Sequence, residues 1–312
     1  MMAKKFPILL SFYGLSHQGV TLVFGQLTFT GIKDLSFQAY SRRKTFRTLF
    51  RLYQTRPYSN QELVLVFDRM EVRTSTNSYG GFYQKTPHDL SGCILQKVVL
   101  PGGEEVKVMA DLYATVISPI NTASIVISDI DDTLVHSFIY KKIRKFRTLM
   151  FTTMEKRQAV VNMQQLIRNF TDSGATPVYL SNSEQNLYPM IYRFLTHNKF
   201  PAGPLFLKQL RSLWDVIWNI KFPVRNIHKT QVLEELLTLF PDKKFVLMGD
   251  NTQHDLPIYL TVAEKYPENI SYIIIRKVVD KTSDEDLVKK ALTFKSPVRV
   301  YYSDNFPSSF EL

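Results

Sequence analysis

The sequence predicts an α/β protein in which a parallel sheet follows a smaller, β-rich N-terminal domain. Up to about residue 122, runs of β-branched and aromatic residues follow one another with turn residues between them. Beyond that point, apolar strand-like runs alternate with amphipathic helical runs, which is typical of a parallel sheet with helical crossovers. We therefore predict two domains, at residues 1–122 and 123–312.

The N-terminal domain is predicted to be β-sandwich-like. Its strand-like runs are at 19–25, 62–67 and 105–117. The segment 41–53 is an exception, because its apolar residues recur at helical spacing beside a stripe of arginines. We read this segment as a basic helical insertion.

The second domain alternates strand and helix along its length. Strands are expected at 123–128, 176–181, 244–249 and 271–275, and helices at 159–170, around 190–196 and at 229–240.

The composition is that of an ordinary soluble globular protein, with 45% hydrophobic and 21% charged residues. One cysteine, Cys93, excludes an internal disulfide and fits a reducing compartment. No stretch reaches the roughly 20 apolar residues that a bilayer-spanning helix needs. The apolar N-terminus is read as part of the fold, so a cytoplasmic location is expected.

The net charge of +11 is concentrated in two segments, 33–56 and 141–157. Each holds seven basic residues and one acidic residue, so the rest of the chain is nearly neutral. Such local basicity favours a docking surface for anions. Two solvated faces are the alternative.

Polar side chains follow the predicted strands of the second domain. In a parallel sheet the carboxyl ends of the strands share one edge, where ligands bind, so one cleft could collect these side chains. They are Asp129 and Asp131 after the first strand, Ser181 and Asn182 after the second, Asp250 and Asp255 after the third, and Lys229 at the start of the preceding helix.

This set of residue types suits phosphoryl transfer. An aspartate can attack phosphorus and form an aspartyl-phosphate, provided that a cation such as Mg²⁺ offsets the charge of the phosphate ester. A second carboxyl group can protonate the leaving oxygen and later deprotonate the hydrolytic water. A lysine and a hydroxyl can hold the remaining phosphate oxygens.

The segment Asp129-Ile130-Asp131-Asp132-Thr133 resembles the first motif of the haloacid-dehalogenase superfamily. Ser181, Lys229 and the stretch Gly249–Asp255 resemble its later motifs in order. Between about residues 120 and 280 the amino-acid sequence resembles one family of this superfamily, the phosphatidate phosphatase family that includes the yeast actin-patch protein. The resemblance implies a haloacid-dehalogenase-like (HAD-like) Rossmannoid sheet and Mg²⁺ as cofactor.

The resemblance also implies a role for each matching residue. Asp129 would be the nucleophile and a metal ligand, and Asp131 the general acid/base, whose backbone carbonyl also binds Mg²⁺. Asp250 would complete the metal site, with Asp255 as a ligand or a supporting carboxylate. Thr133 would steady the loop, and Ser181 and Lys229 would bind phosphate, with Asn182 beside them. His228 and His254 flank these motifs. For His254 a structural or surface role is favoured over a phosphate contact or a metal ligand, because Mg²⁺ prefers oxygen ligands.

The spacing favours an open cleft, because 47 residues separate Thr133 from Ser181 and another 47 separate Ser181 from Lys229. Neither gap easily holds a large cap domain. An open cleft and basic amphipathic segments suit an anionic lipid at a membrane surface. We therefore expect a Mg²⁺-dependent phosphatidate phosphatase that acts peripherally at membranes.

Other functions stay open at this stage. One alternative is a phosphatase of the same superfamily acting on a soluble nucleotide or phosphoprotein, and another is a non-catalytic protein that binds anionic lipid. Nucleic-acid binding by the basic segments is conceivable on charge alone, but no nucleic-acid partner is expected. The sequence does not define an oligomeric state.

Overall fold

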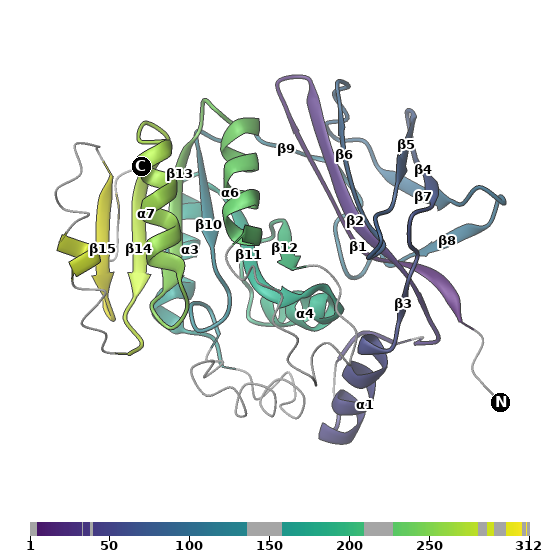
Figure 1. Ribbon diagram of the computed structural model, residues 1–312, viewed down its shortest axis with the longest axis horizontal. Coiled ribbons are helices and arrows are strands. Elements are labelled where there is room, and N and C mark those ends of the chain that lie inside the picture. The colour runs from purple at the N-terminus through teal and green to yellow at the C-terminus, as the bar shows by residue number, and fades with distance from the viewer. Residues whose placement is uncertain are drawn as a thin grey trace. The chain divides into compact units, whose positions relative to one another are not determined.

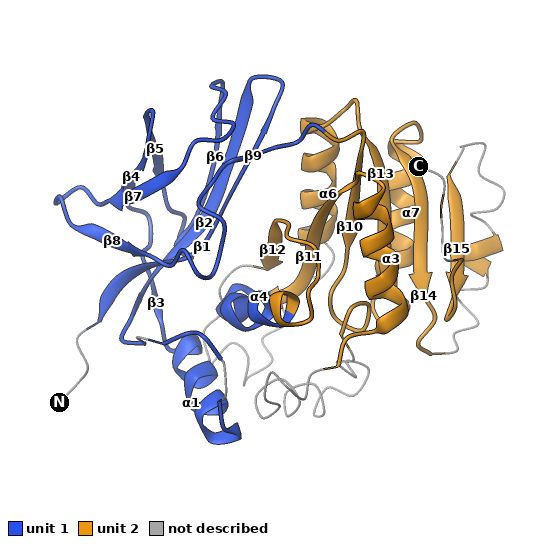
Figure 2. Cartoon of the chain, turned by 180° about the vertical axis from the view of Figure 1, so that it is seen from behind, with its two compact units in different colours: residues 1–121, 184–194, 209–221 blue, residues 122–183, 195–208, 222–312 orange. Residues whose placement is uncertain are grey.

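The computed structural model describes residues 5–32, 34–37, 40–135, 158–208, 227–279, 286–289, 298–307 and 310. The chain divides into two compact units (Figure 2). Among the described residues, unit 1 contains those up to 121 together with 184–194, and unit 2 contains 122–183, 195–208 and those from 227 onward. The basic segment at 141–157 lies wholly outside the described residues.

The described part of unit 1 contains one nine-stranded, mostly antiparallel sheet with the order β3-β2-β1-β8-β7-β4-β5, in which β6 also pairs with β2 and β9 with β1 (Figure 1). The strands are β1 (Phe6–His17), β2 (Val20–Thr30), β3 (Arg56–Pro57), β4 (Glu62–Phe67), β5 (Glu71–Ser75), β6 (Gly81–Thr86), β7 (Leu95–Val99), β8 (Glu105–Val108) and β9 (Ser118–Pro119).

Strand β1 joins the two halves of this sheet. It pairs with β2 along its whole length and with β8 near its start, at Ile8 and Leu9. The ring of Phe12 in β1 lies 6.3 Å from the ring of Phe67 in β4, so the two halves also pack against each other. This packing is compatible with the sandwich-like arrangement expected from the sequence. The apolar N-terminal segment is part of the core, as predicted, since Ile8, Leu9 and Leu10 are fully buried.

The helical insertion expected at 41–53 is confirmed as α1 (Arg42–Tyr53). Ser41 caps it, because its hydroxyl accepts a hydrogen bond from the backbone N–H of Lys44 at 3.2 Å. One side of α1 is buried and carries Leu49 and Leu52. The side chain of Asn186, in the short helix η2 (Gln185–Leu187), donates to the carbonyl of Leu52 at 3.0 Å and ties the two segments together.

The described part of unit 2 holds a six-stranded sheet of order β12-β11-β10-β13-β14-β15, and the chain is therefore a mixed α/β protein. The pairs β10–β11, β10–β13, β13–β14 and β14–β15 are parallel. The strands are β10 (Ser124–Ser128), β11 (Thr176–Glu184), β12 (Leu205–Lys208), β13 (Lys244–Asp250), β14 (Ile270–Arg276) and β15 (Arg299–Ser303).

Helices cover both faces of this sheet. In Figures 1 and 2, α6 (Ile227–Leu239) and α7 (Asp255–Lys265) lie on one face and α3 (Val161–Asp172) on the other. A further helix, α4 (Tyr188–His197), follows η2. The four predicted strands and three predicted helices of this region are confirmed within a few residues. Strands β12 and β15 had not been predicted, because β12 is only four residues long and β15 mixes polar and apolar residues without clear alternation.

The strand order indicates which edge of the sheet is suited to ligand binding. From β10 the chain goes first to β11 on one side and later to β13 on the other, so the order reverses around β10. Loops leaving neighbouring strands in opposite directions open a crevice at their carboxyl ends. Asp129 follows β10 directly and Asp250 is the last residue of β13, so both belong to this crevice.

None of the helices in the described ranges is long and apolar enough to cross a membrane.

Gly25 provides a test of the packing within unit 1. A Cβ atom at this position in β2 would lie 2.4 Å from the backbone oxygen of Ser11 and 2.7 Å from the ring of Phe82. A backbone atom in a paired strand cannot move away cheaply, so we expect Gly25→Ala to lower the free energy of unfolding by about 1–3 kcal/mol. Chemical denaturation measures this change. Gly102→Ala is the control, because a Cβ there meets nothing within 4 Å; equal stability of the two variants would contradict the packing.

Candidate active site

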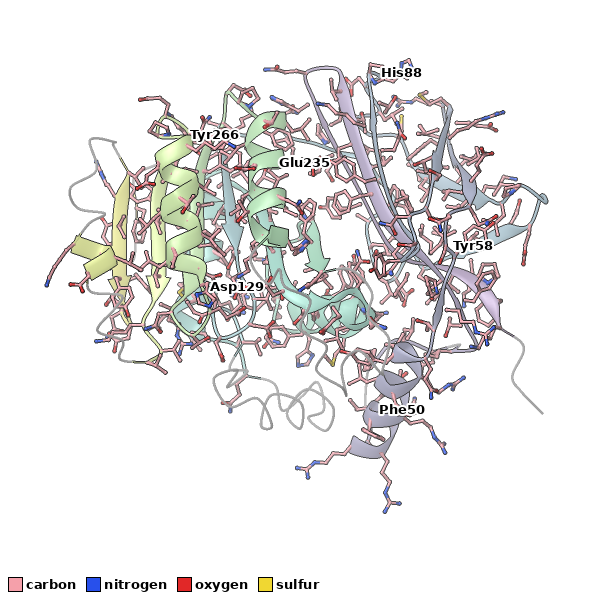
Figure 3. The ribbon with its side chains drawn as sticks, viewed as in Figure 1. Phe50, Tyr58, His88, Asp129, Glu235 and Tyr266 are labelled. Carbon is pink, nitrogen blue, oxygen red and sulfur yellow. The ribbon has the colours of Figure 1, made fainter. Side chains whose placement is uncertain are left out.

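Asp129 directly follows strand β10 and has no contact with water. All five residues of β10 are buried, because the strand lies between β11 and β13 and helices cover both faces of the sheet. Asp129 is itself fully buried, and its backbone N–H donates to the carbonyl of Met248 in β13 at 2.8 Å. A rigid strand therefore holds this carboxylate at its carboxyl end (Figure 3 labels Asp129).

The chain turns sharply after Asp129. The N–H of Leu134 donates to the carbonyl of Ile130 at 2.8 Å, and Asp132 adopts a left-handed backbone with φ of 57°, which Asp tolerates better than most residues. Arg276 at the end of β14 donates to the carbonyl of Asp132 at 2.6 Å. Asp132 is thus a turn residue, and it is buried.

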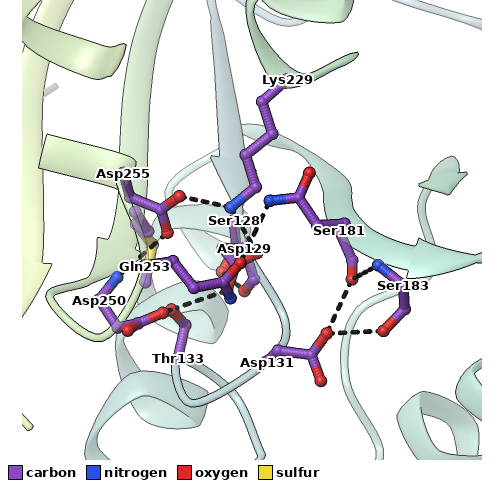
Figure 4. Close-up of polar contacts among 12 residues, drawn as sticks. Ser128, Asp129, Asp131, Thr133, Ser181, Ser183, Lys229, Asp250, Gln253 and Asp255 are labelled. Atoms are coloured by element: carbon purple, nitrogen blue, oxygen red, sulfur yellow. Dashed lines mark hydrogen bonds and ion pairs between the residues drawn. The ribbon is translucent and has the colours of Figure 1, made fainter. Parts of the chain in front are cut away.

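Lys229 lies at the centre of a buried ionic cluster (Figure 4). Its Nζ donates to Asp129 Oδ1 at 2.7 Å and also to Asp255 Oδ1. The other oxygen of Asp129, Oδ2, accepts from the hydroxyl of Thr133 at 3.2 Å. Lys229 and Thr133 each bond one oxygen of Asp129, and this fixes the plane of the carboxylate.

Two further carboxylates complete the cluster from β13 and α7. The hydroxyl of Thr133 lies 3.3 Å from Asp250 Oδ2, and the backbone N–H of Asp250 donates to Asp255 Oδ2 at 3.3 Å. Gly249 permits this approach, because a Cβ atom there would lie 2.7 Å from the side chain of Asp255. Asp255 also begins α7, where the helix dipole favours a negative charge.

The cluster contains more negative than positive charge. Asp129, Asp250 and Asp255 are all fully buried, and Lys229 is the one cation bonded to them among the described residues. Burial, reinforced by the neighbouring carboxylates and only partly opposed by Lys229, raises the pKa of Asp129 well above its usual value. Burial and Asp255 likewise raise the pKa of Asp250 to about 7.

The charge on Lys229 is in turn held by its partners. Burial alone would favour the neutral amine, but the carboxylates of Asp129 and Asp255 outweigh it and keep the pKa of Lys229 well above its usual value. The lysine therefore stays charged, and the excess negative charge of the aspartates has to be offset in another way.

These residues fit a divalent cation. Asp129, Asp250 and Asp255 each offer a carboxylate oxygen, and these oxygens lie within 4.8 Å of one another. Hard oxygen donors without cysteine or histidine suit Mg²⁺ or a similar ion. A bound divalent cation would supply the positive charge that the buried cluster lacks.

Asp131 is held apart from this cluster by two serines. Its Oδ2 accepts from the hydroxyl of Ser183 at 2.6 Å and from the hydroxyl of Ser181 at 3.1 Å. The hydroxyl of Ser181 also accepts from the backbone N–H of Ser183 at 2.9 Å. Ser181 was expected at the phosphate, and in this arrangement it contacts Asp131. Ser183 had not been singled out, although residues two apart in a strand share one face.

A pair of amides lies next to the carboxylates. Asn182 Nδ2 donates to Gln253 Oε1 at 3.1 Å. The opposite ends of both amides, Asn182 Oδ1 and Gln253 Nε2, are buried and have no hydrogen-bond partner among the described residues. Buried polar atoms without partners are rare and often await a ligand or water. Asn182 was predicted to contact substrate, whereas Gln253 had not been assigned a role.

The structure thus brings the predicted residues together in two groups. One group surrounds the nucleophile candidate and consists of Asp129, Thr133, Lys229, Asp250 and Asp255. The other holds Asp131 with Ser181, and Asn182, in β11, bonds Gln253. His254 is exposed, which agrees with the structural or surface role expected of it, and His228 is largely buried at the start of α6. The expected open entrance involves residues 136–157 and 209–226, which lie outside the described ranges.

Comparison with known proteins connects this site to one family. Residues 124–277 match the family model of the catalytic domain of phosphatidate phosphatase APP1. Phosphatidate phosphatase APP1 of Saccharomyces cerevisiae is 31% identical over 159 residues, which are 51% of this chain and 26% of that protein. An uncharacterized protein of Schizosaccharomyces pombe is 29% identical over 255 residues, which are 80% of this chain and 40% of that protein.

The chain spans less than half the length of these two relatives. The match to the Schizosaccharomyces pombe protein is longer than the catalytic-domain match, so it extends beyond residues 124–277. Among solved structures, a carbohydrate acetylesterase from Xanthomonas citri aligns with 92% of this chain and 73% of its own, at 10% identity and a TM-score of 0.26. A similarity of that size indicates neither a shared fold nor a shared function.

The charge excess of the cluster predicts an unusual response to substitution. We expect Asp250→Asn to raise the free energy of unfolding by about 2 kcal/mol in chelator, because it removes one of three crowded, buried negative charges. Added Mg²⁺ should then stabilise the wild type and no longer stabilise the variant. Thermal unfolding with chelator and with Mg²⁺ measures both effects. The exposed Asp172→Asn is the control, and a variant that still responds to Mg²⁺ like the wild type would exclude Asp250 from the metal site.

His228 predicts a pH dependence of stability. Burial, with Lys208 and Lys229 nearby, lowers its pKa to about 4, so the folded protein resists protonation of a group that the unfolded chain protonates near pH 6.5. The stability contributed by neutral His228 is complete above about pH 6.5 and is lost as the pH falls towards 4. Between pH 7 and 5 the wild type should lose about 2 kcal/mol more than His228→Gln. Denaturant titrations at both pH values test this, with the exposed His197→Gln as control.

Proposed function

Since residues 124–277 belong to the family of the phosphatidate phosphatase APP1 catalytic domain, we propose that this chain is a phosphoric monoester hydrolase that removes phosphate from phosphatidate or a related lipid phosphate. The reaction depends on Mg²⁺ and passes through an aspartyl-phosphate at Asp129. The sheet of unit 2 is proposed to be a HAD-like Rossmannoid sheet, and the 1–122 and 123–312 segments to be its N-terminal and catalytic domains.

One observation carries the proposal. Asp129 is a fully buried carboxylate bonded to Lys229 and Thr133, with Asp250 and Asp255 close enough to share a cation. A structural ion pair would balance its charges, whereas this cluster has an excess of carboxylates at the edge of the sheet where ligands bind. Such an excess is expected of a site that takes up a cation together with an anionic substrate.

The cation would be held by Asp129, Asp250 and Asp255, and it would reduce the repulsion between the Asp129 carboxylate and the phosphate ester. Lys229 adds a fixed positive charge on the same side, because its partners keep it protonated. Together these charges allow one anion to approach another in a site without bulk water.

In the first step an oxygen of Asp129 forms a bond to phosphorus while the bond between phosphorus and the ester oxygen breaks. Asp131, in its protonated form, donates its proton to the departing alkoxide, so that diacylglycerol leaves as a neutral alcohol. The hydroxyls of Ser181 and Ser183 orient Asp131 for this transfer through its Oδ2.

In the second step Asp131, now a carboxylate, takes a proton from water. The oxygen of that water attacks phosphorus, the bond between phosphorus and Asp129 breaks, and inorganic phosphate leaves. Asp129 returns as a carboxylate and Asp131 again carries a proton. Thr133 and Lys229 hold Asp129 in one orientation throughout, as their hydrogen bonds to its two oxygens indicate.

The lipid substrate and the peripheral membrane location are supported by the family and by the basic segments of the chain. A cytoplasmic protein that binds membranes reversibly fits both. A phosphatase for a soluble nucleotide or phosphoprotein is the rival within the same chemistry. A non-catalytic lipid-binding protein is the rival outside it.

A substrate panel tests the reaction and the substrate together. With Mg²⁺ we expect hydrolysis of phosphatidate in mixed micelles, none in chelator, and a loss of at least about a thousandfold for Asp129→Asn. Asp131→Asn should slow phosphatidate hydrolysis by about 10²- to 10⁴-fold. It should affect an aryl phosphate less, because a phenolate leaves without needing a proton. Phosphate release measures all of these rates.

Asp132→Asn is the matched control, since Asn tolerates the left-handed backbone of the turn and the variant should keep most of its activity. Rapid hydrolysis of nucleotides or phosphopeptides without hydrolysis of phosphatidate would exclude the lipid substrate while leaving the chemistry intact. If Asp129→Asn hydrolysed these substrates as fast as the wild type, the proposed enzymatic function would be excluded.

A further inference from the structure

The exposed side of α1 carries a stripe of arginines next to two aromatic rings. Arg43, Arg47 and Arg51 are exposed and lie four residues apart, so they share one side of the helix. Phe46 and Phe50 lie along the edge of this stripe with ring centroids 6.0 Å apart, and both residues are partly exposed. Figure 3 labels Phe50 on α1, where several nitrogen-tipped side chains extend from the helix.

The cations of α1 are placed where they disfavour the helix itself. Arg42, Arg43 and Lys44 occupy the first turn, which contains no acidic residue. Positive charges at a helix N-terminus oppose the helix dipole. Lys44 is offset by Asp34 at 3.0 Å, but Arg42, Arg43 and Arg47 form no ion pair with any described residue. An arrangement that weakens the helix favours a role for these arginines in contacts beyond the described residues.

A cationic cavity lies beside α1 in the same unit. It has a volume of about 440 Å³, and its described lining includes Lys5, Arg51 and Arg56 but no acidic residue. The guanidinium of Arg51 donates to the carbonyl of Gly31 at 3.0 Å, and this bond fixes it at the cavity wall. Three cations around one cavity suit an anionic headgroup of phosphate chemistry.

We propose that α1 and this cavity form a docking surface for an anionic phospholipid bilayer. The guanidinium groups of α1 contact lipid phosphates, Phe46 and Phe50 enter the boundary between headgroups and acyl chains, and the cavity takes a headgroup. The choice of lipid as the partner rests on the proposed function. The combination of exposed cations with adjacent aromatic rings on one helix favours a bilayer interface, because a surface for nucleic-acid phosphates alone would not need the rings.

Vesicle binding of the full chain tests this surface. The probe is a phosphatidylcholine vesicle with or without phosphatidylserine, which is anionic and carries no phosphate monoester. We expect the wild type to sediment with the anionic vesicles and not with phosphatidylcholine alone. Each Arg near such a surface contributes roughly fivefold, so Arg42→Gln/Arg43→Gln/Arg47→Gln should weaken binding by about a hundredfold.

A matched triple variant controls for net charge. Arg69, Arg73 and Lys85 are exposed in the same unit but lie outside α1 and the cavity. Arg69→Gln/Arg73→Gln/Lys85→Gln removes the same charge and should bind nearly as well as the wild type. Equal losses in the two triple variants would overturn the assignment to α1, because binding would then follow net charge alone.

A second variant keeps the test decisive if the α1 triple variant folds poorly. Lys5→Gln/Arg56→Gln leaves α1 intact, removes two cations of the cavity and should weaken vesicle binding by at least about tenfold. Unchanged binding would remove the cavity from the surface. Phe46→Ala/Phe50→Ala distinguishes the partner class, because it should weaken vesicle binding and leave any binding of duplex DNA unchanged. Binding of DNA but not of vesicles by the wild type would overturn the proposal.

Failure of this surface and failure of the proposed function give different results. Phosphatidylserine vesicles report docking without catalysis. Hydrolysis of a soluble aryl phosphate by the wild type and by Asp129→Asn reports catalysis without docking. If the protein hydrolyses the soluble ester but does not bind anionic vesicles, the proposed reaction stands and the proposed docking surface is excluded. If it binds the vesicles but does not hydrolyse the soluble ester, the docking surface stands and the enzymatic function is excluded.

Discussion

The ammonium group of Lys229 holds the candidate active site together, because it bonds two carboxylates that come from different elements. Lys229 belongs to α6, Asp129 follows β10, and Asp255 begins α7. None of the three groups is exposed to water, so each would be costly to bury without the others. The ion pairs therefore couple the position of the nucleophile candidate to the packing of both helices on the sheet. Gly249 completes this arrangement by leaving room for the side chain of Asp255.

The same cluster explains why we propose a cation in the site. One buried lysine cannot offset three buried aspartates, and the raised pKa values of Asp129 and Asp250 express the uncompensated charge. Mg²⁺ would reduce this repulsion in the folded chain and prepare the site for an anionic ester. Folding, metal binding and catalysis then share one electrostatic cause. Asp131 stands outside the cluster, with its own hydrogen bonds to Ser181 and Ser183. The two carboxylates of the motif can consequently have different chemical roles although they are two residues apart.

Unit 1 contributes surface features of a different kind. The helix α1 exposes arginines that lack ion-pair partners among the described residues, and the cavity beside it is lined by further cations. These features lie in the part of the chain that extends before the catalytic-domain match, which begins at residue 124. The two proposals together give the two units different roles. Unit 2 would perform the chemistry, and unit 1 would bring the protein to an anionic bilayer, where its substrate resides.

The sequence by itself determined the alternation of strands and helices, the helix predicted at 41–53, and the identity of Asp129, Asp131, Lys229, Asp250 and Asp255 as candidates, because periodicity and short motifs are local properties. In unit 2 it missed the helix α7 and the strands β12 and β15. The two strands are defined by their neighbours in the sheet more than by their own residues. Only the tertiary structure decided that Ser181 and Ser183 meet at Asp131, that Gln253 meets Asn182, and that the aspartates outnumber the cations around them. Those facts depend on burial and on contacts between residues far apart in the chain, and neither is encoded in local spacing.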